Sequence, residues 1–252
     1  MNLIIDIGNT AAKLAVMKGS KVVNLLVDST STLEEGGNFV RQHRDLPTIV
    51  ASVRGTPNTS GTPNKPNEAE KMLSSLAKKP LWLTHQTPLP ITNLYATPET
   101  LGKDRLAAAV GAAYLYPKQN VLVVDAGTAI TYEFVNDRAE YMGGNISPGI
   151  DLRFRALHLF TGKLPLCHRT ETYPALGADT QSAIVAGVLG GVVHEVEAVI
   201  KNFLSKTPNL TTILTGGDAV FFANRLKIPI FVACDLVLIG LNRILEYVHA
   251  KS

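Results

Sequence analysis

Three short glycine-containing turns in this chain each carry an aspartate, a combination that phosphate chemistry requires. They read DIGNT at residues 6–10, DAGT at 125–128 and TGGDA at 215–219. Glycine lets backbone N–H groups approach phosphate oxygens closely, and aspartate supplies a carboxylate for a Mg²⁺ ion that bridges phosphates. A Gly-Gly turn also leaves space for the rings of a nucleoside. Any one of these turns is compatible with an ordinary strand end, but together they favour a nucleotide-binding protein.

Each turn follows an apolar run of the kind that forms an interior strand. The runs are LII before Asp6, VLVV before Asp125 and TIL before Thr215. Continuous leucine and β-branched runs that end in a turn are typical of strands buried on both faces. LIIDIGNT at 3–10 has the same order of residue types as VLVVDAGT at 121–128. This repetition predicts a duplicated fold with one phosphate turn in each half.

The remaining elements are expected to form two α/β halves. In the first half the pattern predicts an antiparallel meander, two short helices and further strands, at residues 11–16, 21–27, 33–45, 48–53, 68–78 and 81–84. The Pro- and Asn-rich stretch at 54–67 is predicted to be an exposed, mobile loop. In the second half the strands and helices alternate after an Ala-rich helix that ends before Pro117; they are expected at 121–125, 130–135, 140–146, 150–160, 180–205, 212–214, 228–233 and 235–249.

Composition and charge exclude several classes of protein. The chain has 252 residues, 46% of them hydrophobic and 18% charged, which is typical of a globular protein with a substantial core. A net charge of +3 gives no reason to expect a nucleic-acid or membrane partner. The longest apolar runs, 106–116 and 183–193, are too short to span a bilayer, and the first residues are already strand and motif, so we expect a cytoplasmic protein. Cys167 and Cys234 have no metal-ligand spacing; a disulfide between them is possible, but reduced thiols are expected.

The order of the motifs resembles that of the type III pantothenate kinases, a family of the actin-like, sugar-kinase-like ATPase superfamily. The resemblance covers nearly the whole chain. The matching segments are DIGNT at 6–10, Tyr95, GKDR at 102–105, DAGTAIT at 125–131, GGNISPG at 143–149, the TxxAIxxG stretch that starts at Thr180, and TGGDA at 215–219. The loop at 54–67 is an insertion away from all of them.

The resemblance implies an α/β fold of two similar actin-like (ribonuclease H-like) domains, residues 1–117 and 118–252. Each domain would have a mixed sheet flanked by helices, with the active site in the cleft between them. The implied reaction transfers the γ-phosphoryl group of ATP to the 4′-hydroxyl of pantothenate, the first step of coenzyme A synthesis. Family members are homodimers that need Mg²⁺ and a monovalent cation, K⁺ or NH₄⁺, and neither nucleic acid nor membrane takes part.

The family motifs also assign roles to residues of this sequence. Asp104 would be the general base, Asp125 would ligate the monovalent cation and Asp6 would hold Mg²⁺. The expected ATP-binding residues are Asp6, Ile7, Gly8, Asn9, Thr10, Ala11, Ala12, Lys13, Thr128, Gly216 and Gly217. The expected pantothenate-binding residues are Tyr95, Gly102, Lys103, Asp104, Arg105 and Thr180.

The residue chemistry agrees with the roles of Asp104 and Arg105. A primary alcohol must lose its proton as it attacks phosphorus, and kinases usually position a carboxylate to accept that proton. A planar guanidinium can bind the pantothenate carboxylate with two parallel hydrogen bonds. Without the other motifs, an Asp–Arg pair at the start of a helix would be read as an ordinary surface pair, since aspartate is favoured there.

Two other readings remain open at this stage. One is a regulatory accessory protein of the same fold whose kinase activity is lost or secondary, and the presence of Asp6, Asp104, Arg105 and Asp125 argues against it. The other is an actin-like or polyphosphate-hydrolysing ATPase, in which water replaces the alcohol. The G-x-D-R signature with Tyr95 upstream favours an organic acceptor.

Overall fold

The computed structural model describes residues 1–30, 33–52, 72–207 and 209–251. The contacts divide the chain into two compact units, one of residues 1–117, 139–141 and 235–252 and one of residues 118–138 and 142–234. The predicted loop at 54–67 and residues 68–71 of the helix predicted at 68–78 lie outside the described residues; of the remaining residues of that helix, only 72–73 are helical. Both cysteines are free thiols, as expected, with Cys167 buried and Cys234 exposed.

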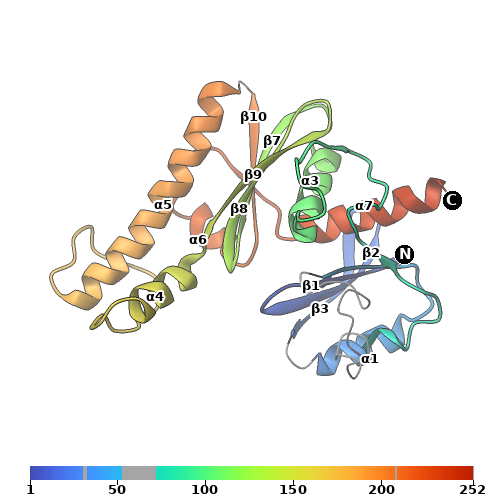
Figure 1. The fold of residues 1–252 in the computed structure, drawn as a ribbon, viewed down its shortest axis with the longest axis horizontal. Coiled ribbons are helices and arrows are strands. Elements are labelled where there is room, and N and C mark those ends of the chain that lie inside the picture. Colours follow the sequence, from blue (N-terminus) through green and yellow to red (C-terminus); the bar gives the residue numbers. More distant parts are fainter. Residues whose placement is uncertain (31–32, 53–71, 208, 252) are drawn as a thin grey trace. The chain divides into compact units, whose positions relative to one another are not determined.

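The first unit is built on a sheet with strand order β3-β2-β1-β4-β5 (Figure 1). β1 (Asn2–Ile7), β2 (Ala11–Lys18) and β3 (Lys21–Ser29) form the predicted antiparallel meander, and β1 pairs in parallel with β4 (Thr48–Ser52), which pairs with β5 (Leu81–Trp82). Alternate residues of β1 and β2 face a core that includes Phe39 and Val40 of α1 (Glu34–Gln42). The strands that the sequence predicts in this part of the chain are therefore confirmed as β1 to β4.

Two helices of the first unit cross with their backbones in contact. They are α3 (Lys103–Leu115) and α7 (Leu236–Lys251), and a Cβ at Gly240 would collide with the carbonyl oxygen of Ala107. Gly111 of α3 likewise faces the backbone of Leu236. This close packing places residues 235–252 in the first unit, although the sequence analysis had grouped them with the second half.

The second unit contains the central strand β7 (Asn120–Ala126), which pairs in parallel with β10 (Leu210–Thr215) and antiparallel with β8 (Ala129–Val135). β10 in turn pairs with the short strand β11 (Phe231–Val232). One face of this sheet packs against α5 (Thr180–Lys206), whose buried face includes Val188, Leu189 and Val192 (Figure 1). α4 (Ile150–Leu159) follows β9 (Glu140–Pro148) and packs beside α5. These elements appear where the sequence analysis predicts them.

Two short elements escaped sequence prediction. β6 (Thr92–Asn93) pairs with the first two residues of β9, and α6 (Ala219–Ala223) follows the Gly-Gly turn. Strands of two residues and helices of five are too short to show a hydrophobic period. The last predicted strand, 228–233, is shorter in the structure, where β11 spans only Phe231–Val232.

The helix α5 is long and apolar. Its length and composition alone would let it cross a membrane, with a mean hydropathy of 1.8 over 18 residues, which differs from the expectation drawn from the 11-residue apolar runs. In that window 44% of the helix is buried inside the protein, and a core helix passes the same test. A Cβ at Gly187 or Gly191 of this helix would meet no described atom within 4 Å.

Candidate active site

The first phosphate turn is a tight hairpin between β1 and β2. Gly8 N donates to Ala11 O at 3.1 Å, and the Thr30 hydroxyl donates to Gly8 O at 3.3 Å. Asp6 and Lys13 lie opposite each other in the strand register, both half-buried, while Asn9 and Thr10 are exposed at the tip. The hairpin thus presents backbone and polar side chains together, as a phosphate site requires.

In the second unit, three glycine turns meet at the carboxyl end of β7. Gly149 N donates to Thr128 O at 3.1 Å, and Asp218 N donates to Ala126 O at 2.9 Å. A Cβ at Gly149 would collide with the carbonyl oxygens of the DAGT turn, and one at Gly216 would collide with the Asp125 carboxylate. Gly216 also has φ of +89°, which favours glycine. The structure therefore brings Asp125, Thr128, Gly216 and Gly217 to one sheet edge.

An arginine that the sequence analysis missed holds the Gly-Gly turn. Arg169 forms ion pairs with Asp218 of the turn and with Asp151 of α4, the latter at 3.1 Å. The hydrogen bond with Asp218 outweighs partial burial and raises the pKa of Arg169 above its ordinary value. Arg169 lies in the irregular segment 161–179, where no periodic pattern could have identified it.

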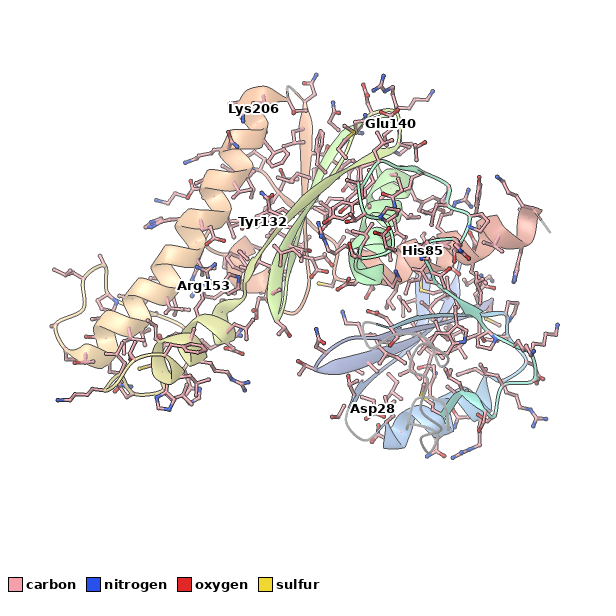
Figure 2. The ribbon with its side chains drawn as sticks, in the orientation of Figure 1. Asp28, His85, Tyr132, Glu140, Arg153 and Lys206 are labelled. Atoms are coloured by element: carbon pink, nitrogen blue, oxygen red, sulfur yellow. The ribbon has the colours of Figure 1, made fainter. Side chains whose placement is uncertain are left out.

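A polar cluster supports the turn that contains Gly149. Glu195 of α5 accepts hydrogen bonds from Ser147 Oγ at 2.7 Å, from Arg153 Nη2 at 2.7 Å and from Tyr132 at 3.4 Å. Arg153 Nε also donates to Pro148 O at 2.8 Å. Figure 2 shows Tyr132 and Arg153 on the side of the sheet that α5 covers. The cluster links α4, α5 and β8 to the residue that precedes Gly149.

Burial and hydrogen bonding act on the titration of this cluster in opposite directions. Burial raises the pKa of Glu195, but the hydrogen bonds from Ser147 and Arg153 lower it more, so the net pKa lies below its ordinary value. Burial, with the nearby charge of Glu195, raises the pKa of Tyr132. Near neutral pH the cluster therefore holds an ionised glutamate and a neutral tyrosine.

Five of the six predicted pantothenate residues lie in the first unit, at or near the start of α3, whereas Thr180 lies in the second unit. Gly102 precedes the helix, and a Cβ there would lie 2.6 Å from Asp104 Oδ1. That same oxygen accepts a hydrogen bond from Arg105 N at 2.8 Å, which fixes the half-buried carboxylate in the first turn of the helix. Lys103 Nζ donates to Leu101 O at 3.2 Å.

Arg105 is only 6% exposed and contacts two tyrosines. Its Nη2 donates to Tyr141 Oη at 3.1 Å, and its Cζ lies 5.5 Å from the centre of the Tyr95 ring. The Tyr95 and Tyr141 rings stack, with centroids 6.1 Å apart and an angle of 22°. Tyr141 was not among the residues predicted from sequence, because its only signal is an apolar position in a strand.

Thr180 is exposed at the first position of α5. The preceding residue, Asp179, caps the helix: its carboxylate accepts from Ser182 N at 2.9 Å, and Ser182 Oγ accepts from Asp179 N at 3.1 Å. This reciprocal capping box fixes where α5 begins and hence where Thr180 is presented.

The described residues include no group of three or more His, Cys, Asp or Glu that could hold a metal ion. A cation at Asp125 would therefore draw most of its oxygen ligands from backbone, water or a nucleotide. Mg²⁺ is commonly bound in this way, through one or two carboxylates together with substrate phosphates. The single carboxylates Asp6 and Asp125 are compatible with that mode of binding.

Comparison with known proteins first defines the class. The fold is similar to that of a Baf family transcriptional activator from Campylobacter jejuni, with a TM-score of 0.62 and 20% identity over 99% of this chain and 100% of that one. It is also similar to an activator of 2-hydroxyisocaproyl-CoA dehydratase from Clostridium difficile solved with bound ADPNP, with a TM-score of 0.51 and 14% identity over 99% and 96% of the two chains. The chain thus has the actin-like ATPase fold, α/β with two mixed sheets flanked by helices.

Sequence comparison then defines the family. The pattern that describes type III pantothenate kinases matches residues 2–202. A type III pantothenate kinase from Bacteroides fragilis is 46% identical over the full length of both chains. The chain belongs to the type III pantothenate kinase family, whose members are ATP-dependent phosphotransferases that act in coenzyme A biosynthesis. The kinase reading drawn from the sequence is confirmed.

Proposed function

We propose that this chain transfers the γ-phosphoryl group of ATP to the 4′-hydroxyl of pantothenate with Asp104 as general base and Arg105 as the carboxylate clamp. The convergence of Tyr95, Asp104 and Arg105 at the start of α3 is the observation that carries this proposal. A carboxylate and a guanidinium on consecutive residues support the proposal, because one can accept the proton of a hydroxyl and the other can bind a carboxylate.

Asp104 is suited to act as the general base because its carboxylate is held in one orientation. The hydrogen bond from Arg105 N, at 2.8 Å, fixes its orientation, and the absence of a side chain at Gly102 leaves room for it there. A fixed carboxylate near the attacking hydroxyl both orients that hydroxyl and accepts its proton as the bond to phosphorus forms.

Arg105 is suited to binding the pantothenate carboxylate because its guanidinium is almost wholly removed from solvent. In such surroundings a charge-assisted hydrogen bond is stronger than in water. The clamp would hold pantothenate by its carboxylate, at the end of the molecule remote from the 4′-hydroxyl, and so direct the hydroxyl toward Asp104.

The phosphates would bind through residues 6–13 and Thr128, and the adenosine against Gly216 and Gly217. Support comes from the Gly8 hairpin and from the open space at Gly217, where a Cβ would meet no described atom within 4 Å. Mg²⁺ would bind through Asp6 and the phosphates, and K⁺ or NH₄⁺ through Asp125. These cations would offset charge on the triphosphate.

A homodimer formed through α5 completes the proposal. The exposed face of α5 carries Ala183, Gly187 and Gly191, small residues that permit close approach of a second copy. Phe160 and Leu176, near the same helix in the chain, are 86% and 87% exposed. A face of this kind is typical of a surface that a second subunit covers. We expect the dimer to act in the cytoplasm.

One coupled assay tests the central proposal. ADP release is followed with ATP, Mg²⁺ and K⁺, with pantothenate or with water as the only acceptor. Release that depends on pantothenate, together with a phosphorylated product, supports the kinase; release with water alone would indicate an ATPase. The absence of ADP release in both would favour a regulatory protein of the same fold.

A further inference from the structure

Tyr141 contacts both of the side chains that the proposed function assigns to the pantothenate end of the site. Its hydroxyl accepts from Arg105 Nη2 at 3.1 Å, and its ring stacks on Tyr95. It comes from β9, a strand distant in sequence from α3, and is wholly buried.

The backbone around Tyr141 is fixed on both sides. Asn93 of β6 pairs with Tyr141, and Leu94 N donates to Tyr141 O at 3.0 Å. The Asn93 side chain then accepts from Tyr95 N at 3.0 Å. One short ladder therefore determines where the Tyr141 hydroxyl lies and where the Tyr95 ring lies relative to it.

An arginine needs such support because its side chain is long and flexible, whereas carboxylate recognition requires one orientation of the planar guanidinium. A hydrogen bond to one terminal nitrogen fixes the rotation of that plane, and the Tyr95 face on one side restricts its tilt. The hydrogen bond to Arg105 is made by Tyr141 itself, and the ring that restricts the tilt is Tyr95, on which Tyr141 stacks.

We propose that Tyr141 is a positioning residue: it orients the Arg105 guanidinium and thereby sets the preference of the enzyme for an acceptor that carries a carboxylate. This inference rests on the proposed role of Arg105. Tyr141 itself acts through Arg105 and Tyr95.

The test compares two acceptors, pantothenate and pantothenol, in which an uncharged hydroxymethyl group replaces the carboxylate. The quantity measured is the ratio of kcat/KM for pantothenate to kcat/KM for pantothenol. Tyr141→Phe keeps the ring and removes only the hydroxyl. It should lower this ratio by about three- to tenfold, the loss expected for one ordinary hydrogen bond, and the change should appear in the KM for pantothenate. The KM for ATP should stay near that of the unaltered enzyme.

Tyr132→Phe is the matched control. Tyr132 is also buried and also hydrogen-bonded to a charged side chain, Glu195, but it lies in the second unit. The control should leave the acceptor ratio unchanged. Tyr141→His, which cannot place a hydrogen-bonding atom where the hydroxyl lies, should lower the ratio as Tyr141→Phe does.

A Tyr141→Phe enzyme with an unchanged ratio, or one that loses both acceptors equally, would overturn the inference. The variant Arg105→Ala distinguishes an error in the role of Tyr141 from an error in the proposed role of Arg105. If Arg105→Ala lowers the ratio but Tyr141→Phe does not, only the role of Tyr141 is wrong. If Arg105→Ala also keeps the ratio, the clamp assigned under the proposed function fails, and the role of Tyr141 fails with it.

Discussion

Asp104 and Arg105 are neighbours in the chain but have different surroundings. The Asp104 carboxylate is half-buried and oriented by a backbone N–H, whereas Arg105 is buried and contacts Tyr95 and Tyr141. Substitutions at the two positions should therefore change different kinetic constants.

Asp104→Asn should lower kcat while ATP binding barely changes. The amide keeps the shape of the side chain and one acceptor oxygen but cannot take a proton, and general bases contribute about 10²–10⁴-fold. Steady-state kinetics with saturating ATP and pantothenate measure this loss, and Arg105→Ala provides the contrast because it should raise the KM for pantothenate first. Near-normal turnover of Asp104→Asn would leave Asp104 only a role in orienting the hydroxyl, which a dissociative transition state would permit.

Asp125→Ala should abolish the response to monovalent cations. The Asp125 carboxylate lies against Gly216 at the edge where three turns meet, so a cation held there would offset charge beside the triphosphate. Activity is titrated with KCl and with NH₄Cl, at constant ionic strength. If the variant keeps the full K⁺ response, the cation binds elsewhere.

At the scale of elements, glycines without room for a side chain show which contacts hold the first unit together. The α3–α7 crossing depends on Gly111 and Gly240, since their backbones meet the facing helix directly. The helix α5 behaves differently, because its glycines face outward.

Gly240→Ala should destabilise the protein by about 1–3 kcal/mol, the usual range for overpacking a tight contact. The new methyl group would meet the Ala107 carbonyl, and the two helices would have to separate. Gly37→Ala in α1 is the control: its Cβ would have ordinary contacts, and alanine should stabilise the helix by roughly 0.5–1 kcal/mol. Urea unfolding measures both, and equal effects of the two substitutions would contradict the close crossing.

The Glu195 cluster makes stability depend on pH. Because the pKa of Glu195 is lower in the folded protein than in the unfolded chain, its contribution is complete above the unfolded pKa and is lost as the pH falls through the folded pKa. Glu195→Gln should therefore lower the thermal midpoint by a few degrees near pH 7 and by less near pH 3. Calorimetry at both pH values measures this difference, with Glu197→Gln, whose carboxylate pairs with Lys201 on the same helix, as the control. A difference between wild type and Glu195→Gln that stays constant with pH would refute the assignment.

At the scale of the whole molecule, the exposed small-residue face of α5 is the surface that the proposed dimer would use. Glycine in an exposed helix costs about 1 kcal/mol relative to alanine, and Gly187 and Gly191 meet no described neighbour that would offset this cost. A second copy on this face would supply those contacts.

Sedimentation should therefore show an active dimer, and Gly187→Trp should convert it to a monomer of lower activity. Gly37→Leu, on a helix of the other unit, should remain dimeric. A wild-type protein that is fully active as a monomer at assay concentration would refute the proposed dimer.

The sequence by itself determined the strand order along the chain, the phosphate turns and the family. These depend on local patterns: short apolar runs bounded by turns predicted β1 to β4, and glycine near aspartate marked the turns at 6–10 and 125–128. Such signals lie within a few residues of one another, so they can be read without knowledge of distant contacts.

Only the tertiary structure decided which distant residues support the site. Tyr141 reaches Arg105 through the two-residue pairing of β6 with β9, and Arg169 reaches Asp218 from an irregular segment. The placement of residues 235–252 in the first unit likewise depends on the backbone contact at Gly240. None of these contacts leaves a periodic trace in the sequence, because each is set by the packing of elements that lie far apart in the chain.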